Sequence, residues 1–155
     1  MCIRDSIRIV RNVSLVDDYF EILLYYPSLR VRLHSSYLVR EALPGYILHG
    51  TKGSFIKAKT DVQESMLQAG VLPDIEDWGV EPESEKGLLH TEKDGQVLKE
   101  YKPSLRGNYL EYFEGMYSAI NKNEAPPVSA QDGLNVVYII QKAFQSNHEK
   151  KVIKL

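Results

Sequence analysis

Side chains able to do chemistry are few in this chain, and they form no recognisable catalytic motif. The four histidines, His34, His49, His90 and His148, are scattered, without the spacing of a zinc site. We therefore expect no metal. The run Gly50 to Ser54 is not a phosphate loop, because its lysine precedes the second glycine and the run leads into a predicted strand. No Gly-x-Gly-x-x-Gly follows a strand, so we expect no dinucleotide site of the usual kind.

The composition predicts one soluble domain. The chain has 155 residues and a net charge of -2, with acids and bases interspersed, so we expect no nucleic-acid partner. No apolar run approaches the roughly 20 residues that span a membrane, and no signal sequence opens the chain. Cys2 is the only cysteine and has no partner for an internal disulfide. We expect a cytoplasmic protein.

Residue patterns predict a series of strands with short turns. In Leu29 to Leu38, apolar and polar residues alternate, as in a strand with one wet face. Gly50 to Gly53 predicts a hairpin whose glycines adopt positive φ, and Asp94-Gly95 predicts a two-residue hairpin. The predicted strands are Ile7 to Arg11, Asp18 to Tyr26, Leu29 to Leu38, Tyr46 to His49, Ser54 to Lys57, Gly87 to Glu92, Gln96 to Tyr101 and Val152 to Leu155.

Three helices are predicted between and after these strands. Thr60-Asp61 begins a short helix over Val62 to Ala69 that Gly70 ends. Apolar residues at spacings of three and four from Tyr109 indicate a second helix that ends near Asn123. Ser129, with Asp132 three residues later, caps a third helix whose apolar stripe includes Phe144.

The segment Val71 to Lys86 is too irregular for a simple connection. Trp78 lies in its middle, and a large ring in a polar loop usually anchors the loop. Packing beneath its own loop is the favoured interpretation, and contact with a ligand or a partner subunit is the alternative.

Strands followed by two amphipathic helices predict an α+β domain, with a largely antiparallel open sheet and helices packed on one face. Apolar and aromatic residues occupy both sides of the strand around Tyr19 to Tyr26. We therefore expect the second sheet face to be covered by a partner domain or by another subunit of a homo-oligomer.

Residues 1–6, Met-Cys-Ile-Arg-Asp-Ser, resemble the translated adapter remnant that sometimes begins assembled gene fragments. We expect them to be a non-native leader outside the fold. Residues 7–155 would then be the domain, and the natural protein would begin earlier.

Three motifs carry a resemblance to a known family. They are Asp17 to Ile22, then Leu48-His49-Gly50-Thr51-Lys52-Gly53-Ser54-Phe55, and finally Gly107-Asn108-Tyr109 continuing to Pro127-Val128-Ser129-Ala130-Gln131-Asp132-Gly133-Leu134. From about Ile7 to Leu155 the chain resembles the C-terminal half of the glucose-fructose oxidoreductase and inositol dehydrogenase family, Gfo/Idh/MocA. Its Trp78-Gly79 loop and Gly87-Leu88-Leu89-His90 segment most resemble the NADP-dependent scyllo-inositol dehydrogenase branch.

The resemblance implies a two-domain oxidoreductase that acts on a secondary hydroxyl of a sugar or cyclic polyol. A separate N-terminal domain would bind NAD or NADP, and this domain would supply the substrate-pocket wall and the subunit contacts. In the family, a Glu-Lys-Pro lysine and a later Asp and His act on the substrate hydroxyl. None of these positions occurs here, and Lys102-Pro103 lies in the wrong part of the chain. We therefore expect this chain alone to be inactive, with no catalytic residue of its own.

The resemblance also suggests residues near the substrate. The candidates are Tyr37, Arg40 and Glu41, with Trp78 in the covering loop. Arg40 and Glu41 could hydrogen-bond polyol hydroxyls, and an ordinary surface ion pair is an equal alternative. For Tyr109, packing is favoured over substrate contact.

Two other hypotheses remain open. The chain could be a stand-alone, non-catalytic module that binds a sugar or dimerises, or it could belong to an inactive relative of the dehydrogenase. Neither the choice between NAD and NADP nor the sugar follows from these residues.

Overall fold

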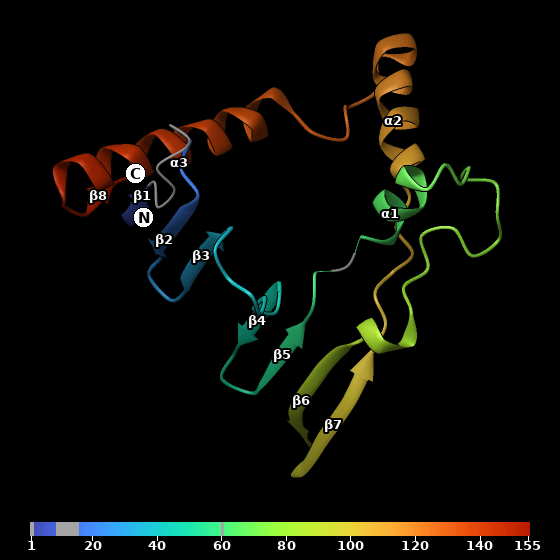
Figure 1. Cartoon of the computed structure of the whole chain (residues 1–155), viewed down its shortest axis with the longest axis horizontal. Coiled ribbons are helices and arrows are strands. Elements are labelled where there is room, and N and C mark those ends of the chain that lie inside the picture. Colours follow the sequence, from blue (N-terminus) through green and yellow to red (C-terminus); the bar gives the residue numbers. More distant parts are fainter. Residues whose placement is uncertain (1, 9–15, 60) are drawn as a thin grey trace. The chain divides into compact units, whose positions relative to one another are not determined.

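The computed structural model describes residues 2–8, 16–59 and 61–155, which form two compact units (Figure 1). The first unit consists of Met1–Glu41 and Val128–Leu155, and the second consists of Ala42–Pro127. Open antiparallel sheets and helices confirm the α+β class. The strands form two four-stranded sheets, where we had predicted one.

The first unit has a sheet of strand order β3-β2-β1-β8, in which every neighbouring pair is antiparallel. Helix α3 lies in the unit's second chain segment and packs against β1 and β8. The elements are β1 (Cys2–Arg8), β2 (Tyr19–Tyr25), β3 (Arg30–Ser36), α3 (Ala130–Glu149) and β8 (Ile153–Lys154).

Strand β1 places residues 2–6 in the first sheet, where we had expected them to lie outside the fold. It pairs with β2 along its whole length, from Cys2 opposite Tyr25 to Arg8 opposite Tyr19, and Ile3 also pairs with Ile153 of β8. Backbone pairing with β2 along the whole strand, and with β8 at Cys2 and Ile3, stabilises it there. Of the predicted strand, Ile7 and Arg8 belong to β1, and residues 9–11 lie outside the described residues.

The core of the first unit lies between its sheet and α3. Ile22 and Leu24 alternate with less buried residues along β2, so they share the face that α3 covers. Ile3 is fully buried beside them. The helix begins as predicted, because Ser129 and Asp132 form a reciprocal capping box. Ala143 and Ile153 complete this cluster.

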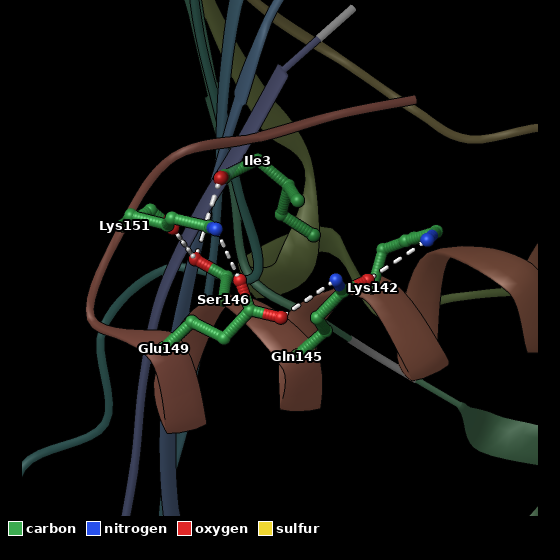
Figure 2. A network of polar contacts seen from close by, with 6 residues as sticks. All are labelled: Ile3, Lys142, Gln145, Ser146, Glu149 and Lys151. Carbon is green, nitrogen blue, oxygen red and sulfur yellow. Dashed lines mark hydrogen bonds and ion pairs between the residues drawn. The ribbon is translucent and has the colours of Figure 1, made fainter.

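A buried hydroxyl joins α3 to strand β1 and to the short turn that precedes β8 (Figure 2). Ser146 is buried, and its Oγ lies 2.8 Å from the carbonyl oxygen of Lys151 and 3.4 Å from that of Ile3. Beside it, Lys142, Gln145, Glu149 and Lys151 form a chain of polar contacts along the exposed side of the helix. Ser146 therefore provides a polar link between segments 143 residues apart.

The second unit has a sheet of order β4-β5-β6-β7, again antiparallel throughout. Within one or two residues, its strands and α-helices match the predicted elements, whereas its short 3-10 turn was not predicted. They are β4 (Tyr46–His49), β5 (Gly53–Lys57), α1 (Val62–Gln68), the 3-10 turn η1 (Glu83–Glu85), β6 (Gly87–Lys93), β7 (Gln96–Lys102) and α2 (Tyr109–Lys122).

Both predicted hairpin turns are present, but for different reasons. Asp94 and Gly95 have φ of 53° and 75°, as the two-residue turn requires. Gly50 and Gly53 close the other turn through a 2.8 Å backbone hydrogen bond, but neither has positive φ. The predicted reason was therefore wrong for this turn. A Cβ on Gly53 would lie 2.7 Å from the carbonyl oxygen of His90, so close packing of β5 against β6 favours glycine.

The two longer helices differ in how deeply their side chains are buried. Helix α3 packs on the first sheet, whereas α2 buries none of its side chains completely. In the described part of the chain, no helix is both long and apolar enough to cross a membrane.

Candidate functional site

Three of the four predicted substrate residues lie at the end of the first unit. Tyr37 follows β3, its amide donates to the carbonyl of Asp18 at 3.1 Å, and its side chain is 77% exposed. Arg40 and Glu41 are exposed in the connection toward β4. No ion pair joins Arg40 and Glu41, or either one to another of the described residues. Contact of these three residues with a substrate stays a prediction.

Trp78, the fourth candidate, belongs to the second unit and is only 4% exposed. Its indole Nε1 donates to Gln63 Oε1 at 3.2 Å, and its carbonyl accepts from Arg106 Nε at 2.6 Å. Its ring therefore anchors its own loop, as the favoured interpretation held. A direct contact between this ring and a substrate stays untested.

Gln63 holds three segments of the second unit together. It lies in the first turn of α1 and is buried, and its Oε1 accepts from both Trp78 Nε1 and the Tyr109 amide, the latter at 2.9 Å. Nearby, the Gly107 amide donates to the Gly79 carbonyl, where a side chain on Gly79 would overlap Gly107. One carboxamide thus positions the Trp78 loop and the first residue of α2.

A second contact joins the beginnings of α1 and α2. Asp61 caps α1 by accepting from the Glu64 amide, and its other carboxylate oxygen accepts from the Tyr109 hydroxyl. This hydrogen bond raises the pKa of Tyr109 to about 12. It also lowers the pKa of Asp61, together with the bond from Glu64. Tyr109 therefore links the beginnings of the two helices through its hydroxyl, whereas the role that we favoured for it was packing.

Lys57 and Glu81 form a largely covered ion pair between β5 and the long loop. Their Nζ and Oε2 atoms are 2.5 Å apart, and each side chain is 10% exposed. Lys57 also donates to the Glu85 carbonyl, and the Ser104 amide donates to Glu81 Oε1. Burial raises the pKa of Glu81, but the bonds from Lys57 and Ser104 outweigh it, so the pKa lies below its usual value.

An open groove of about 420 Å³ lies on the second sheet. Its lining includes the apolar residues Leu43, Pro44, Ile56, Leu88 and Tyr101 and the polar residues Lys59, Ser84 and Lys86. Such a lining favours binding over covalent chemistry. Among the described residues, no three His, Cys, Asp or Glu side chains gather as a metal site would need.

Comparison with known proteins shows which family has this architecture. Residues 8–155 match the family model described as the oxidoreductase family, C-terminal alpha/beta domain, of the Gfo/Idh/MocA group. The chain belongs to this family. Over 138 residues it is 37% identical to scyllo-inositol 2-dehydrogenase (NADP(+)) IolW of Bacillus subtilis, spanning 89% of this chain and 38% of IolW.

Solved structures of the family agree with the fold. The oxidoreductase YvaA of Bacillus subtilis superposes with a TM-score of 0.94 at 34% identity, over 99% of this chain and 44% of YvaA. An oxidoreductase from Bacteroides fragilis gives a TM-score of 0.90 at 40% identity, over 99% of this chain and 47% of that one. The chain therefore spans less than half the length of these relatives and corresponds to their C-terminal domain.

Gln63, Lys57 and Glu81 were missed by the sequence analysis. Gln63 looks like any polar residue of a first helical turn, and Glu81 is one of several acids in an irregular loop. Their partners lie 15 to 46 residues away, so no local pattern could identify them.

Proposed function

We propose that this chain is the substrate-side and subunit-contact domain of an NAD(P)-dependent oxidoreductase that acts on a secondary hydroxyl of a sugar or inositol-like polyol. The observation that carries the proposal is the 37% identity to a protein named as an NADP-dependent scyllo-inositol 2-dehydrogenase. In such a reaction, hydride leaves the carbinol carbon for the nicotinamide, and the hydroxyl proton passes to a base, leaving a ketone. The N-terminal part of the enzyme, to which this chain does not correspond, would bind the cofactor and supply the base.

This proposal assigns the chain a binding role. Tyr37, Arg40 and Glu41 would contact the polyol, because their exposed polar groups can donate to and accept from neighbouring hydroxyls. Trp78 would act indirectly, by anchoring its loop through its hydrogen bonds with Gln63 and Arg106. Direct contact of its ring with the substrate is the alternative. We also propose a cytoplasmic location, in line with the single cysteine.

The test compares this chain alone with the same chain fused behind the N-terminal part of Bacillus subtilis IolW. We expect NADPH formation from scyllo-inositol or a related sugar by the fusion and none by the chain alone. In the fusion, Arg40→Ala and Glu41→Ala should raise KM more than kcat changes, as lost substrate binding requires. Lys99→Ala, another exposed charge, is the matched control. Turnover by the chain alone would contradict the proposal, and sugar binding without turnover in either protein would favour a non-catalytic module.

We further propose that the second sheet contacts another copy of the chain. Ile47, Ile56, Leu88 and Tyr101 form one row across its four strands, and all but Leu88 are exposed. Such an apolar row favours self-association. Light scattering of the fusion should show an oligomer that Ile56→Lys converts to a smaller species. A monomeric fusion would exclude this contact.

A further inference from the structure

The buried side chain of Gln63 has a donor group that the second unit leaves unused. Its exposed fraction is 5%, and its Oε1 accepts from the Trp78 indole and from the Tyr109 amide. Because both of these partners are donors, the oxygen faces them and the NH2 group, Nε2, points the other way. Within the described part of the chain, Nε2 has no hydrogen-bond acceptor. Buried amides of this kind usually bind a water or a ligand atom.

Nε2 lies beside Gly107, at a position that this glycine leaves open. The place that a Cβ of Gly107 would occupy is 2.6 Å from Nε2 and 3.6 Å from the carboxamide carbon of Gln63. Apart from the chain neighbours of Gly107, no other atom of the described second unit comes within 4 Å of that place. An oxygen atom there could accept from Nε2 without meeting another side chain of the unit.

Two crossing segments hold this position in a fixed shape. The Gly107 amide donates to the Gly79 carbonyl, and Arg106 Nε donates to the Trp78 carbonyl at 2.6 Å. A Cβ on Gly79 would overlap the Gly107 carbonyl, so the absence of a side chain allows the two segments to approach. All of these residues belong to the second unit. The donor of Gln63 is therefore preorganised by contacts within one unit.

The chemistry of the group indicates which kind of atom it binds. An amide NH2 donates hydrogen bonds and carries no charge, so it suits the oxygen of a hydroxyl or a carbonyl group. The open place beside Gly107 has the size of one side-chain atom, so it admits a single group at the edge of a larger molecule. A polyol presents hydroxyl groups of this kind around its ring.

We infer that Gln63 Nε2 and Gly107 form a subsite for one hydroxyl group of the polyol substrate. The inference rests on the proposed function for the class of substrate, and it adds a binding residue from α1. Gln63 then has two tasks, because its Oε1 positions the Trp78 loop and its Nε2 recognises the hydroxyl. A substrate analogue without that hydroxyl would leave the buried donor unpaired, so the subsite discriminates against it.

Side-chain amide NMR of protein labelled with 15N-glutamine tests the subsite without relying on turnover. The Gln63 signal is identified with Gln63→Glu, which keeps an acceptor for Trp78 and Tyr109 but has no amide hydrogens. Adding scyllo-inositol should move this signal in a saturable way, both in this chain and in its fusion to the N-terminal part of IolW. Gln131, whose amide donates to Asn135 in the other unit, is the internal control and should not move.

Gly107→Ala places a methyl group in the open position. Because Gly107 does not have positive φ, alanine fits its backbone. The variant should abolish the effect of inositol on the Gln63 signal. In the fusion, it should raise KM for scyllo-inositol about tenfold with a smaller change in kcat, as a lost binding contact requires. Gly133→Ala is the matched control, because a Cβ there meets no atom within 4 Å. Circular dichroism checks that each variant folds, and the titration of the natural chain needs no variant.

Three results would overturn the inference. The first is a Gln63 signal that inositol leaves unchanged in both proteins. The second is a shift that Gly107→Ala retains or that Gln131 shares, and the third is a water bound at the amide hydrogens that inositol does not displace. A saturable shift without turnover in the fusion would support the subsite while contradicting the proposed activity. Turnover with an unchanged Gln63 signal would do the reverse, so the two failures are distinguishable.

Discussion

Removing the acidic partner of Lys57 should destabilise the second unit by a measurable amount. Glu81→Gln keeps an acceptor for the Ser104 amide but leaves the Lys57 ammonium without its counter-charge. Breaking a fully buried pair costs about 3–5 kcal/mol. Because each side chain is 10% exposed and Lys57 retains the Glu85 carbonyl, we expect a smaller loss, of about 2 kcal/mol.

Thermal and urea unfolding would measure this loss through the fluorescence of Trp78, the only tryptophan, which is buried in the same unit. A loss of about 2 kcal/mol corresponds to a fall in Tm of roughly 4–8 °C for a chain of this size. The control is Glu83→Gln, which breaks the exposed pair with Lys86 and should cost less than about 0.5 kcal/mol. Replacing both partners, as Lys57→Met with Glu81→Leu, should recover most of the stability, because no orphan charge remains.

The pH dependence provides a second check on the same pair. Since the pKa of Glu81 is lower in the folded protein than its usual 4.5, its contribution is fully present above that value. It is lost as the pH falls through the folded pKa. The stability difference between the natural chain and Glu81→Gln should therefore be constant near neutral pH and shrink in acid. Equal stability of the two proteins at pH 7 would refute the argument that this pair holds the loop on the sheet.

Three further predictions concern the polar contacts between segments. Gln63→Leu removes the acceptor shared by Trp78 and the Tyr109 amide, so it should lower the free energy of unfolding by about 2 kcal/mol. The emission of Trp78 should shift to the red, and an unchanged spectrum would contradict the assigned role. Ser146→Ala should destabilise the first unit by about 1 kcal/mol, and Ser146→Val should destabilise it more, because the buried site has no room for added carbons. Urea unfolding followed by circular dichroism measures both losses, and a valine variant of unchanged stability would contradict this prediction. The pKa of Tyr109 is raised to about 12, so the stabilisation from its bond to Asp61 is complete below pH 10 and lost as the pH rises toward 12. Absorbance titration at 295 nm of the natural chain and of Tyr109→Phe should differ by one tyrosine that ionises in this high range. Ionisation of that tyrosine near pH 10 would contradict the bond.

Local patterns identified most of the elements correctly. The Asp94-Gly95 turn, the Ser129 and Asp132 cap, and the apolar spacing of α2 all depend on neighbours a few residues apart, and each is present where predicted. The family motifs were also sufficient to recognise the C-terminal oxidoreductase domain. By contrast, the part of β1 over residues 2–6 was not predicted, because it depends on partners up to 152 residues away, such as Lys154 opposite Cys2.

Sequence alone therefore determined the α+β class and the order of the elements, because periodicity, caps and turns are properties of short segments. The family followed from the resemblance of three motifs. The division into two sheets, the burial of Trp78 against Gln63 and the Lys57 and Glu81 pair were decided only in three dimensions. Each depends on which distant segments meet. A carboxylate in a loop, or a ring on a helix, has the same appearance in sequence whether it faces water or a partner.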